Sequence, residues 1–485
     1  MSIRKVRLHN FRGFQSAEIE LKPLTVLLGP NSAGKSSFGH ALAAMTHAHR
    51  TFSGTPQANL TAAEASATTW PVDLGNLNDL RTNGADGPVE VGIQTDAGLI
   101  EIGFGLDSVP SLLPSYFLYP RGAEIRSPET GEVAVVPQET TTPTVARTGT
   151  IGPTVVHGST DTHYEVRRIN EFQWQESGIP SLVSLDGLLL RSITHEGGTS
   201  RLLSGRAMGE LEFLFQNLTY LRPTRARPLR TYPAGSSRRF AAGRALTTPD
   251  SPQEIGYSGE SSAAVLHRRA EEPVHYAGLP NIPNLGEKWE ISAGKSAGLV
   301  SDTLVGSVRA WLQRLRLADS LRTFSEGNSE RIEVLVTLAG QSEHNIVEIG
   351  FGTSQVLPIL IAGLLQPSGS VFIVDLPEAH LHPRPQADLA DFFCSLALSN
   401  RFSLVETHSE MFFHRLRLRV EMDEVLKEKI AVYFIDEPKE GLCCQPRRVG
   451  LGYDEQLSWP VGFLQEAWET ESQIEQAHHY KSLIK

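Results

Sequence analysis

Short apolar runs alternate with stretches of helical length along this sequence, most regularly in its last third. Short, mostly apolar runs of five or six residues predict strands at Val371–Asp375, Phe402–Glu406 and Ile430–Ile435. Patterns of helical length separate these runs, and we expect helices over 354–365, 383–398 and 409–419. Alternation of apolar strands with helices predicts an α/β fold with a largely parallel sheet that is covered on both faces.

The first hundred residues show a mixed pattern of strands and one helix. Strand-like runs occupy 6–8, 18–21 and 25–28, a helix is expected from 35 to 45, and a hairpin from 89–94 and 99–104. The C-terminal lobe is expected to begin with a helix over 304–317 and a strand over 332–338. We therefore expect an N-terminal lobe at 1–105, a C-terminal lobe at 301–420 and a C-terminal extension at 421–485.

Between the two lobes, residues 106–300 have a different character. Pro, Gly, Ser and Thr become frequent, strand-like pieces recur, and one helix is expected near 207–218. This predicts a β-rich insertion with some helix. It also holds a stretch, 221–249, with no acidic residue and seven arginines: Arg222, Arg225, Arg227, Arg230, Arg238, Arg239 and Arg244.

Composition narrows the class of protein. The 485 residues are 40% hydrophobic and 20% charged, as in ordinary soluble proteins. A net charge of -11 argues against a chain that coats nucleic acid non-specifically, although it leaves room for a local basic patch. Three cysteines, no signal-peptide pattern at the start, and no apolar run near the ~20 residues of a membrane span lead us to expect a cytoplasmic protein without a membrane partner.

The sequence GPNSAGKS at 29–36 follows an apolar strand and precedes a helix, which is the context of a phosphate-binding P-loop. Backbone amides of such a loop and the positive end of its helix cradle phosphates. The lysine is expected to reach the β- and γ-phosphates and the serine after it to ligate Mg²⁺. The residues expected around the nucleotide are Gly29, Asn31, Ser32, Ala33, Gly34, Lys35, Ser36 and Ser37.

Two further segments contain candidate ligand-binding residues: an acid at the end of a strand and glycines before a helix. The strand VFIVD ends in Asp375, an acid that in nucleotide-hydrolysing proteins sits beside the P-loop and holds magnesium through water. The segment EIGFGTSQ at 348–355 is a glycine-rich turn before a helix, which Thr353 and Ser354 are expected to cap. It either faces the nucleotide of a partner subunit or is an ordinary capped helix.

Histidines follow two of the apolar strands. His408, after the strand Phe402–Glu406, lies where the ligand edge of a parallel sheet is expected and is a candidate sensor of the γ-phosphate, or else a capped surface residue. His380 and His382 form an HxH pair, which permits a zinc or manganese site.

Together and in this order, these motifs resemble the ABC-type ATPase heads of the RecF, SMC and OLD families. The segments VEIGFGTSQVLPIL, VDLPEAHLHPRPQADLADFF and VETHSE are similar to those of bacterial stand-alone ATPases in that group, many of which sit in anti-phage or DNA-maintenance gene clusters. The opening KVRLHNFRGFQSAEIEL resembles the first strands of such heads, which flank the adenine. The resemblance covers about 1–105 and 301–415, and it implies an ABC/SMC-like P-loop head split into two lobes.

The resemblance implies a role for each motif. Lys35 and Ser36 take the phosphate and magnesium roles, Asp375 the Walker B role and His408 the switch role. The signature role falls to a segment that acts on the partner's nucleotide and includes Gly350, Gly352, Thr353, Ser354 and Gln355. The HLHP sequence at 380–383 would be a D-loop-like element at a dimer interface instead of a metal site.

One departure from the family pattern concerns catalysis. These families usually place a glutamate directly after the Walker B acid, whereas this chain has Leu376, which can neither accept a proton nor orient water. Glu378 is the candidate substitute, although the turn would aim it differently. We therefore predict a slow, Mg-dependent ATPase in which ATP acts largely as a clamp.

The arginine stretch leaves two interpretations open. Arg222, Arg225, Arg227 and Arg230 could contact DNA, RNA or a phosphorylated partner, or the stretch could be a solvated loop. Related ATPases carry an Arg-Pro segment after a YL pair, which implies that Arg222 or Arg225 packs near the nucleotide.

Three hypotheses about function follow. The leading one is an ATP-gated homodimer, or a higher even oligomer, that acts as a switch for a nuclease or toxin-like effector in anti-phage defence. The second is a RecF-like DNA-binding ATPase in DNA repair or maintenance. The third is a scaffold that holds ATP without hydrolysing it.

Overall fold

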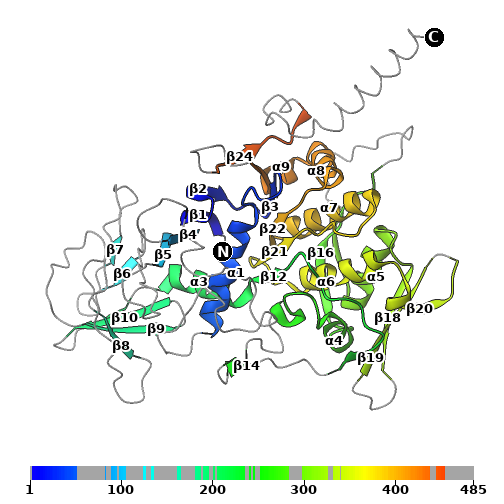
Figure 1. Cartoon of the computed structure of the whole chain (residues 1–485), viewed down its shortest axis with the longest axis horizontal. Helices are drawn as coiled ribbons and strands as arrows, with labels where there is room; N and C mark the ends of the chain where they lie inside the picture. The colour runs from blue at the N-terminus through cyan, green and yellow to red at the C-terminus, as the bar shows by residue number, and fades with distance from the viewer. Residues whose placement is uncertain are drawn as a thin grey trace, which may run out of the picture.

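The chain was analysed as a computed structural model (Figure 1). It describes residues 3–51, 82, 205–234, 252–282, 298–325, 331–338, 340–436 and 444–453, together with short strands at 89–95, 98–104, 124–126, 133–135, 161–164, 181–186, 189–195, 200–202, 240–241 and 244–245.

A six-stranded sheet forms the centre of the fold. Its order is β12 (Thr219–Leu221), β21 (Val371–Asp375), β22 (Phe402–Glu406), β3 (Leu24–Leu28), β23 (Ile430–Ile435) and β24 (Pro446–Val449). The first five strands run parallel, and β24 is an antiparallel edge. Because β3 lies between β22 and β23, the N-terminal P-loop strand is inserted among strands from the end of the chain. The predicted parallel sheet is confirmed.

Both faces of this sheet are covered, which explains why its inner strands β21, β22, β3 and β23 are mostly apolar and buried instead of alternating. Toward one face, Ile373 and Leu404 pack with α1 (Ser36–Thr51), α3 (Gly205–Asn217) and the N-terminal strands. Toward the other, Phe372 and Val405 pack with α6 (Phe351–Leu365), α7 (Pro383–Leu398) and α8 (Glu410–Met422). Figure 1 shows α1 and α6 on opposite sides of the sheet.

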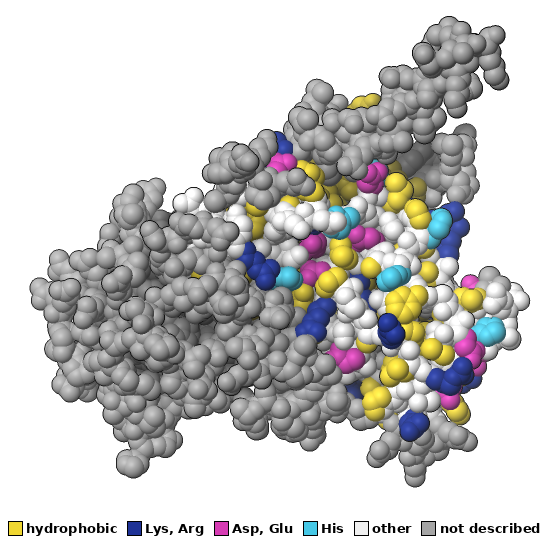
Figure 2. All heavy atoms as spheres, viewed as in Figure 1, with side chains coloured by type: hydrophobic (Ala, Val, Ile, Leu, Met, Phe, Trp, Pro, Cys, Tyr) yellow, Lys and Arg dark blue, Asp and Glu magenta, His cyan; other side chains and the backbone are white. Residues whose placement is uncertain are grey.

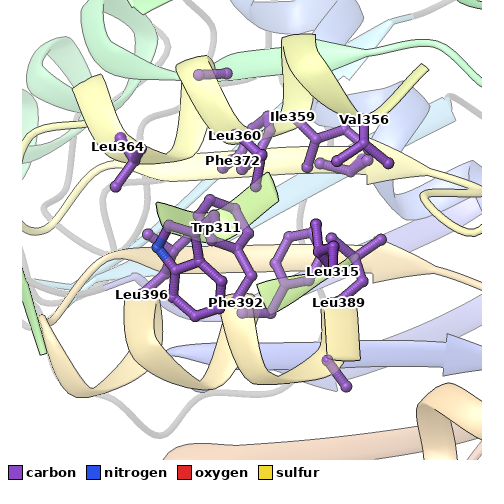
Figure 3. Packing of buried hydrophobic residues seen from close by; sticks show 14 of the residues in the cluster. Trp311, Leu315, Val356, Ile359, Leu360, Leu364, Phe372, Leu389, Phe392 and Leu396 are labelled. Carbon is purple, nitrogen blue, oxygen red and sulfur yellow. The ribbon is translucent and has the colours of Figure 1, made fainter. Parts of the chain in front are cut away.

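The second face holds the larger core (Figure 3). Trp311 lies edge-on to Phe392, with ring centroids 5.1 Å apart, and Phe372 stacks on Phe393. The helices on this face and around it are α4 (Ser262–Arg268), α5 (Leu304–Arg314), α6 (Phe351–Leu365), α7 (Pro383–Leu398), α8 (Glu410–Met422) and α9 (Glu424–Lys429), with the short turns η1 (Pro252–Ile255) and η2 (Ile346–Glu348).

Smaller antiparallel sheets surround the centre. The N-terminal one has the order β2 (Phe14–Glu20), β1 (Ile3–Phe11), β4 (Val89–Thr95) and β5 (Gly98–Phe104), so the predicted hairpin is confirmed. Another joins β13 (Tyr232–Pro233), β19 (Arg331–Thr337) and β18 (Ser320–Phe324), with β20 (Glu343–Asn345) paired to β19. β16 (Pro273–Ala277) pairs with β17 (Leu299–Thr303).

The remaining described strands belong to the middle of the chain. They are β6 (Glu124–Arg126) with β7 (Val133–Val135), the sheet of β8 (Asp161–Tyr164), β9 (Ser181–Asp186), β10 (Leu189–His195) and β11 (Ser200–Leu202), and β14 (Phe240–Ala241) with β15 (Arg244–Ala245).

The lobes are less separate in space than their expected boundaries. The range 106–300 was expected to be an insertion, yet β12 from this range forms the edge of the central sheet, against β21. Likewise β23 and β24, which fall in the expected extension 421–485, belong to the same sheet. A strand as short as β12 has no periodicity of its own, and its partner follows it by about 150 residues. No helix among the described residues is long and apolar enough to span a bilayer.

Candidate nucleotide-binding site

The P-loop joins β3 to α1 and is shaped by residues with positive φ. At Gly29, φ is +143° and a Cβ atom would lie 2.2 Å from the carbonyl oxygen of Ile435, so no side chain fits. At Gly34, φ is +92° and a Cβ would meet the ring of Phe14 at 3.0 Å. Asn31 and Ser32 are exposed at the loop, whereas the side chains of Ala33 and Ser37 are buried. The last two can therefore serve a ligand only through their backbone.

Lys35 is almost fully buried at the start of the helix. Its Nζ donates to the carbonyl oxygen of Pro30 at 2.6 Å. Burial lowers the pKa of this amine, while the nearby Glu406 and Glu378 oppose that shift. A buried cation that is held by its own loop and faces two carboxylates is positioned for an anionic ligand.

Asp375 ends β21 beside the P-loop helix. Its Oδ2 accepts a hydrogen bond from the Tyr220 hydroxyl at 2.7 Å and lies 3.4 Å from Nε2 of His40. Arg12 lies 3.2 Å from Nδ1 of His40, and because arginine can only donate, the imidazole proton sits on Nε2, toward Asp375. The absence of a side chain at Gly39, where a Cβ would come 2.9 Å from Ile373, lets α1 approach β21 this closely.

Glu406 is a residue of the site that the sequence motifs did not identify. It ends β22, in register with Asp375 on one side and Leu27 on the other. Its carboxylate is hydrogen-bonded to the Ser36 side chain. Burial, followed by the charge of Asp375, raises its pKa to about 7 against the opposing effects of Ser36 and Lys35. The signal that could have found it is its place at the C-terminal end of a buried parallel strand.

Glu378 and His408 lie together near Lys35. Oε1 of Glu378 accepts the backbone N–H of His408 at 2.7 Å, and the Thr407 side chain also bonds to this carboxylate. Burial raises the pKa of Glu378 in spite of these bonds. The imidazole of His408 is hydrogen-bonded to the Gly29 backbone, and partial burial and the charge of Lys35 lower its pKa.

Leu376 adopts φ +47° between the two acids. Its N–H donates to the Glu406 carbonyl at 2.8 Å, and its side chain is half-buried. The chain therefore turns sharply after Asp375, which brings Glu378 back toward the P-loop. The turn aims Glu378 at the His408 backbone, a direction that the sequence could not give.

The arginine stretch contains one deeply buried member. Arg225 is 3% exposed, and its guanidinium donates to the carbonyl oxygens of Asp375 at 2.9 Å and Leu376 at 2.8 Å. Burial lowers its pKa to about 10 against the opposing charges of Asp375 and Glu378. The expectation that Arg225 could contact nucleic acid does not suit its place in the fold, because the side chain is buried and two of its nitrogens donate to the turn at Asp375 and Leu376.

The other arginines of this set are arranged differently. Arg222 lies over the Tyr257 ring at 5.9 Å, and Arg227 is exposed. Arg230 forms a 2.7 Å ion pair with Glu348, at the foot of the glycine-rich turn. The side chains of Arg238, Arg239 and Arg244 lie outside the described residues.

The glycine-rich turn leads into α6 earlier than expected. The helix begins at Phe351 with Gly350 as its N-cap, so the prediction that Thr353 and Ser354 cap it is wrong. Both lie buried inside the first turn, where their hydroxyls donate to the carbonyl oxygens of Leu317 and Phe351. Gln355 is also buried. The start of the helix is exposed only at Gly350 and Phe351, since Gly352 is half-buried.

The HLHP turn packs against this helix start. The His380 ring meets Phe351 edge-on at 4.9 Å, and a Cβ at Gly352 would lie 3.1 Å from the His380 carbonyl oxygen. His380 and His382 are both exposed. Within the described part of the chain, no three His, Cys, Asp or Glu side chains are grouped to hold a metal ion by themselves.

The residues nevertheless fit a magnesium ion that arrives with a nucleotide. Mg²⁺ keeps several waters and takes one or two carboxylates plus phosphate oxygens. The Ser36 hydroxyl and the buried carboxylates of Asp375 and Glu406 are donors of this kind. In Figure 2, acidic, basic and histidine side chains gather near the centre of the described face, where Figure 1 shows β21 and β22.

Two ranges of the chain, which hold the two halves of this site, match known protein families. Residues 1–92 match the family described as AAA ATPase domain, and residues 313–413 match the family described as AAA domain, putative AbiEii toxin, Type IV TA system. No curated protein matches the sequence.

Solved structures of SMC head domains are similar to this chain, with TM-scores of 0.41 or lower. The SMC head domain from Thermotoga maritima is 9% identical with a TM-score of 0.34 and covers 93% of this chain and 100% of that one. An SMC head bound to the C-terminal winged-helix domain of ScpA is 11% identical with a TM-score of 0.41, covering 93% and 99%. A head from Pyrococcus furiosus bound to the C-terminal domain of ScpA is 11% identical with a TM-score of 0.40, covering 98% and 99%.

The two family matches contain the P-loop on one side and the glycine-rich turn, Asp375 and His408 on the other. These are the segments that the fold brings together around Lys35, and their matches to AAA domain families support a generic ATPase activity for this chain.

Proposed function

We propose that this protein binds ATP with Mg²⁺ and hydrolyses it slowly. The observation that carries the proposal is the convergence of Ser36, Asp375 and Glu406, from three separate elements, beside the buried Lys35. Magnesium, when bound, would supply positive charge that offsets the charge developing on the phosphates. Ser36 and the two carboxylates would hold it.

In this proposal each side chain has a defined task. Lys35 exchanges the Pro30 carbonyl for phosphate oxygens. Glu378 accepts a proton from the attacking water through its free carboxylate oxygen, and His408 binds the γ-phosphate side of the site. With Leu376 in place of the usual glutamate, the water is oriented only by a carboxylate that is already bonded to the His408 backbone, which favours slow turnover.

The test is phosphate release by purified protein with Mg-ATP. The wild type should release phosphate and be stabilised against heat by Mg-ATP, while Lys35→Ala should lose both effects. Equal release by the two proteins would mean contaminating activity. Thermal stabilisation without release would favour a scaffold that holds ATP without hydrolysing it.

We further propose that ATP closes a head-to-tail homodimer. Support comes from the exposed start of α6 at Gly350 and Phe351, a helix N-terminus whose backbone amides suit a phosphate of a second chain. Two helix N-termini on one γ-phosphate give the closed state the differential affinity that a switch requires.

Gly350→Asp tests the dimer. No atom lies within 4 Å of a Cβ at this position, so the variant should fold normally and repel the nucleotide. Gly352→Asp would instead press on Leu381 and His380 of its own chain. Gel filtration with light scattering should show an ATP-dependent dimer for wild type and for the charge control Ser368→Asp, at the other end of α6. An unchanged dimer in Gly350→Asp would exclude this arrangement.

The dimer would act as a switch for a separate effector, in anti-phage defence. Support comes from the family matched by 313–413, whose description names a putative toxin of a Type IV toxin–antitoxin system. The product of the neighbouring gene should bind in an ATP-dependent manner. Binding that is unaffected by Lys35→Ala would contradict the switch.

The alternative, a RecF-like DNA-binding ATPase, rests on the exposed arginines. Since Arg225 is buried, its test uses Arg227→Glu with Arg230→Glu only. Salt-dependent DNA binding that this pair abolishes would favour the alternative.

A further inference from the structure

Glu406 occupies a central position among the strands that build the site. It is the last residue of β22, which lies between the Walker B strand β21 and the P-loop strand β3. Register pairs it with Asp375 on one side and with Leu27, two residues before the P-loop, on the other. A carboxylate here faces both halves of the nucleotide site.

The described hydrogen bonds of Glu406 leave one of its two carboxylate oxygens without a partner. It is hydrogen-bonded to the Ser36 side chain, with Lys35 close enough to interact with its charge. The residue is 9% exposed, and its Oε2 is buried with no hydrogen-bond partner among the described residues. A buried carboxylate oxygen without a partner is costly, and therefore points to a ligand that the protein binds.

The charge around this oxygen is strongly negative. Glu406 lies close enough to Asp375 and Glu378 to feel the charges of both carboxylates, and Lys35 is a nearby ammonium group of opposite charge. Arg225 directs its described hydrogen bonds to backbone carbonyl oxygens. The triphosphate of ATP adds further negative charge, so a divalent cation is needed before the phosphates and these acids can share the site.

The bond to Ser36 also prepares that hydroxyl for a cation. A serine hydroxyl has one proton and two lone pairs. When its proton is donated to Glu406, both lone pairs are left to face a metal ion. Partners that orient a metal ligand in this way raise metal affinity.

We propose that Glu406 is a second carboxylate of the magnesium site: one oxygen orients Ser36, and the other binds the ion or one of its waters. This rests on the ATP binding proposed above. Asp375 and Glu406 would then bracket the ion from neighbouring strands, and the protein would discriminate strongly against metal-free ATP.

The experiment compares ATP affinity with excess Mg²⁺ and with EDTA, measured by calorimetry on the full chain. Glu406→Gln should weaken Mg-ATP binding about tenfold and strengthen metal-free ATP binding about tenfold, because a single negative charge near both ligands is removed. The ratio of the two affinities should therefore fall about a hundredfold. Glu406→Asp, which keeps the charge, should retain most of the ratio.

Glu410→Gln is the matched control, since it removes an acid of the same segment that lies in the first turn of α8. Its ratio should equal that of the wild type. An unchanged ratio in Glu406→Gln, in a protein that still binds ATP, would overturn this inference and leave the proposed function standing. Failure of wild type and variants alike to bind ATP would remove both.

Discussion

The guanidinium of Arg225 donates a hydrogen bond of 2.8 Å to the carbonyl oxygen of Leu376, the residue at which the chain turns after Asp375. A second bond, to the Asp375 carbonyl, holds the preceding peptide. Since Leu376 has φ +47°, a conformation unfavourable for leucine, the arginine is a clamp on a strained turn. It is thus a positioning residue for Glu378 and part of the folded core.

Arg225→Ala should therefore cost stability and weaken catalysis together. Two buried carbonyl oxygens would lose their donors, and we expect unfolding to become easier by about 3 kcal/mol. Arg225→Lys should recover part of this loss because one ammonium cannot reproduce the two-pronged contact. Urea unfolding of the nucleotide-free protein measures the effect.

The exposed Arg227 provides the control for this change. Arg227→Ala should alter stability by no more than about 0.5 kcal/mol. A loss of stability of the same size in both variants would mean that removing any arginine from this segment destabilises the protein. The hydrogen bonds of Arg225 would then not be the cause.

Glu378→Gln should stop hydrolysis while leaving ATP bound. The amide oxygen can still accept the His408 N–H, but glutamine cannot take a proton from water, so we expect a loss of about 100-fold in turnover. ATP affinity should stay within about threefold of the wild type, on the scale of a lost weak contact. Single-turnover phosphate release, with affinity from calorimetry, separates the two quantities.

The wild-type pH profile gives an independent check on Glu378. A base must be ionised, and burial raises the pKa of this carboxyl above its ordinary value of 4.5. Turnover should therefore rise with pH over a range that lies above 4.5. A profile that is the same for Glu378→Gln would assign the base elsewhere.

A buried ion cluster ties α7 to α5 and α8. Asp391 is fully buried and accepts hydrogen bonds from Arg419 at 2.7 and 2.8 Å, Arg314 at 2.9 Å and Arg415 at 3.1 Å. Burial alone would raise the pKa of Asp391, but the bonds to Arg419 and the charges of the three arginines lower it. This carboxylate is the shared partner of all three cations.

Asp391→Asn should destabilise the protein by about 3 to 5 kcal/mol, because it leaves buried guanidinium charge unbalanced. Equilibrium unfolding in urea measures the loss. The surface pair of Asp436 and Arg447 offers a contrast, since both side chains are nearly half exposed. Asp436→Asn should change stability by less than about 1 kcal/mol, and a similar loss at both positions would contradict the role of burial.

The sequence predicted some elements to the residue and missed others for physical reasons. β21, β22, β23 and α7 match their predicted bounds because each is an apolar run or a proline-initiated helix with clear ends. The start of α6 was displaced by three residues from its predicted start at 354, since Gly350 caps the helix without a side chain.

The residues of the site likewise include some that the sequence identified and some that it did not. The P-loop lies within a continuous sequence, so its residues could be named in advance. Glu406 was not named as a site residue, because its importance comes from the position of β22 between β21 and β3. Burial of Arg225 was equally hidden, since the residues around it in the sequence, such as Pro223, Thr224 and Arg227, are exposed.

Glu406 should make the nucleotide-free protein less stable as pH rises. Its carboxyl has a pKa of about 7 in the folded protein and an ordinary value near 4.5 when unfolded. Between these values the unfolded chain binds fewer protons, so the free energy of unfolding falls with increasing pH. Each pH unit costs up to about 1.4 kcal/mol, and the loss is complete above the folded pKa. Thermal melting in EDTA across this range measures it.

Glu406→Gln removes the titrating group and should flatten this slope, so that the variant melts above the wild type at pH 8 and close to it at pH 5. Glu410→Gln should keep the wild-type slope. Because Mg-ATP supplies the cation that the ionised carboxylate requires, adding it should stabilise the wild type more than Glu406→Gln and narrow the difference in melting temperature between them at pH 8. A difference in melting temperature between wild type and Glu406→Gln that is constant over this pH range would show that the carboxyl does not titrate there.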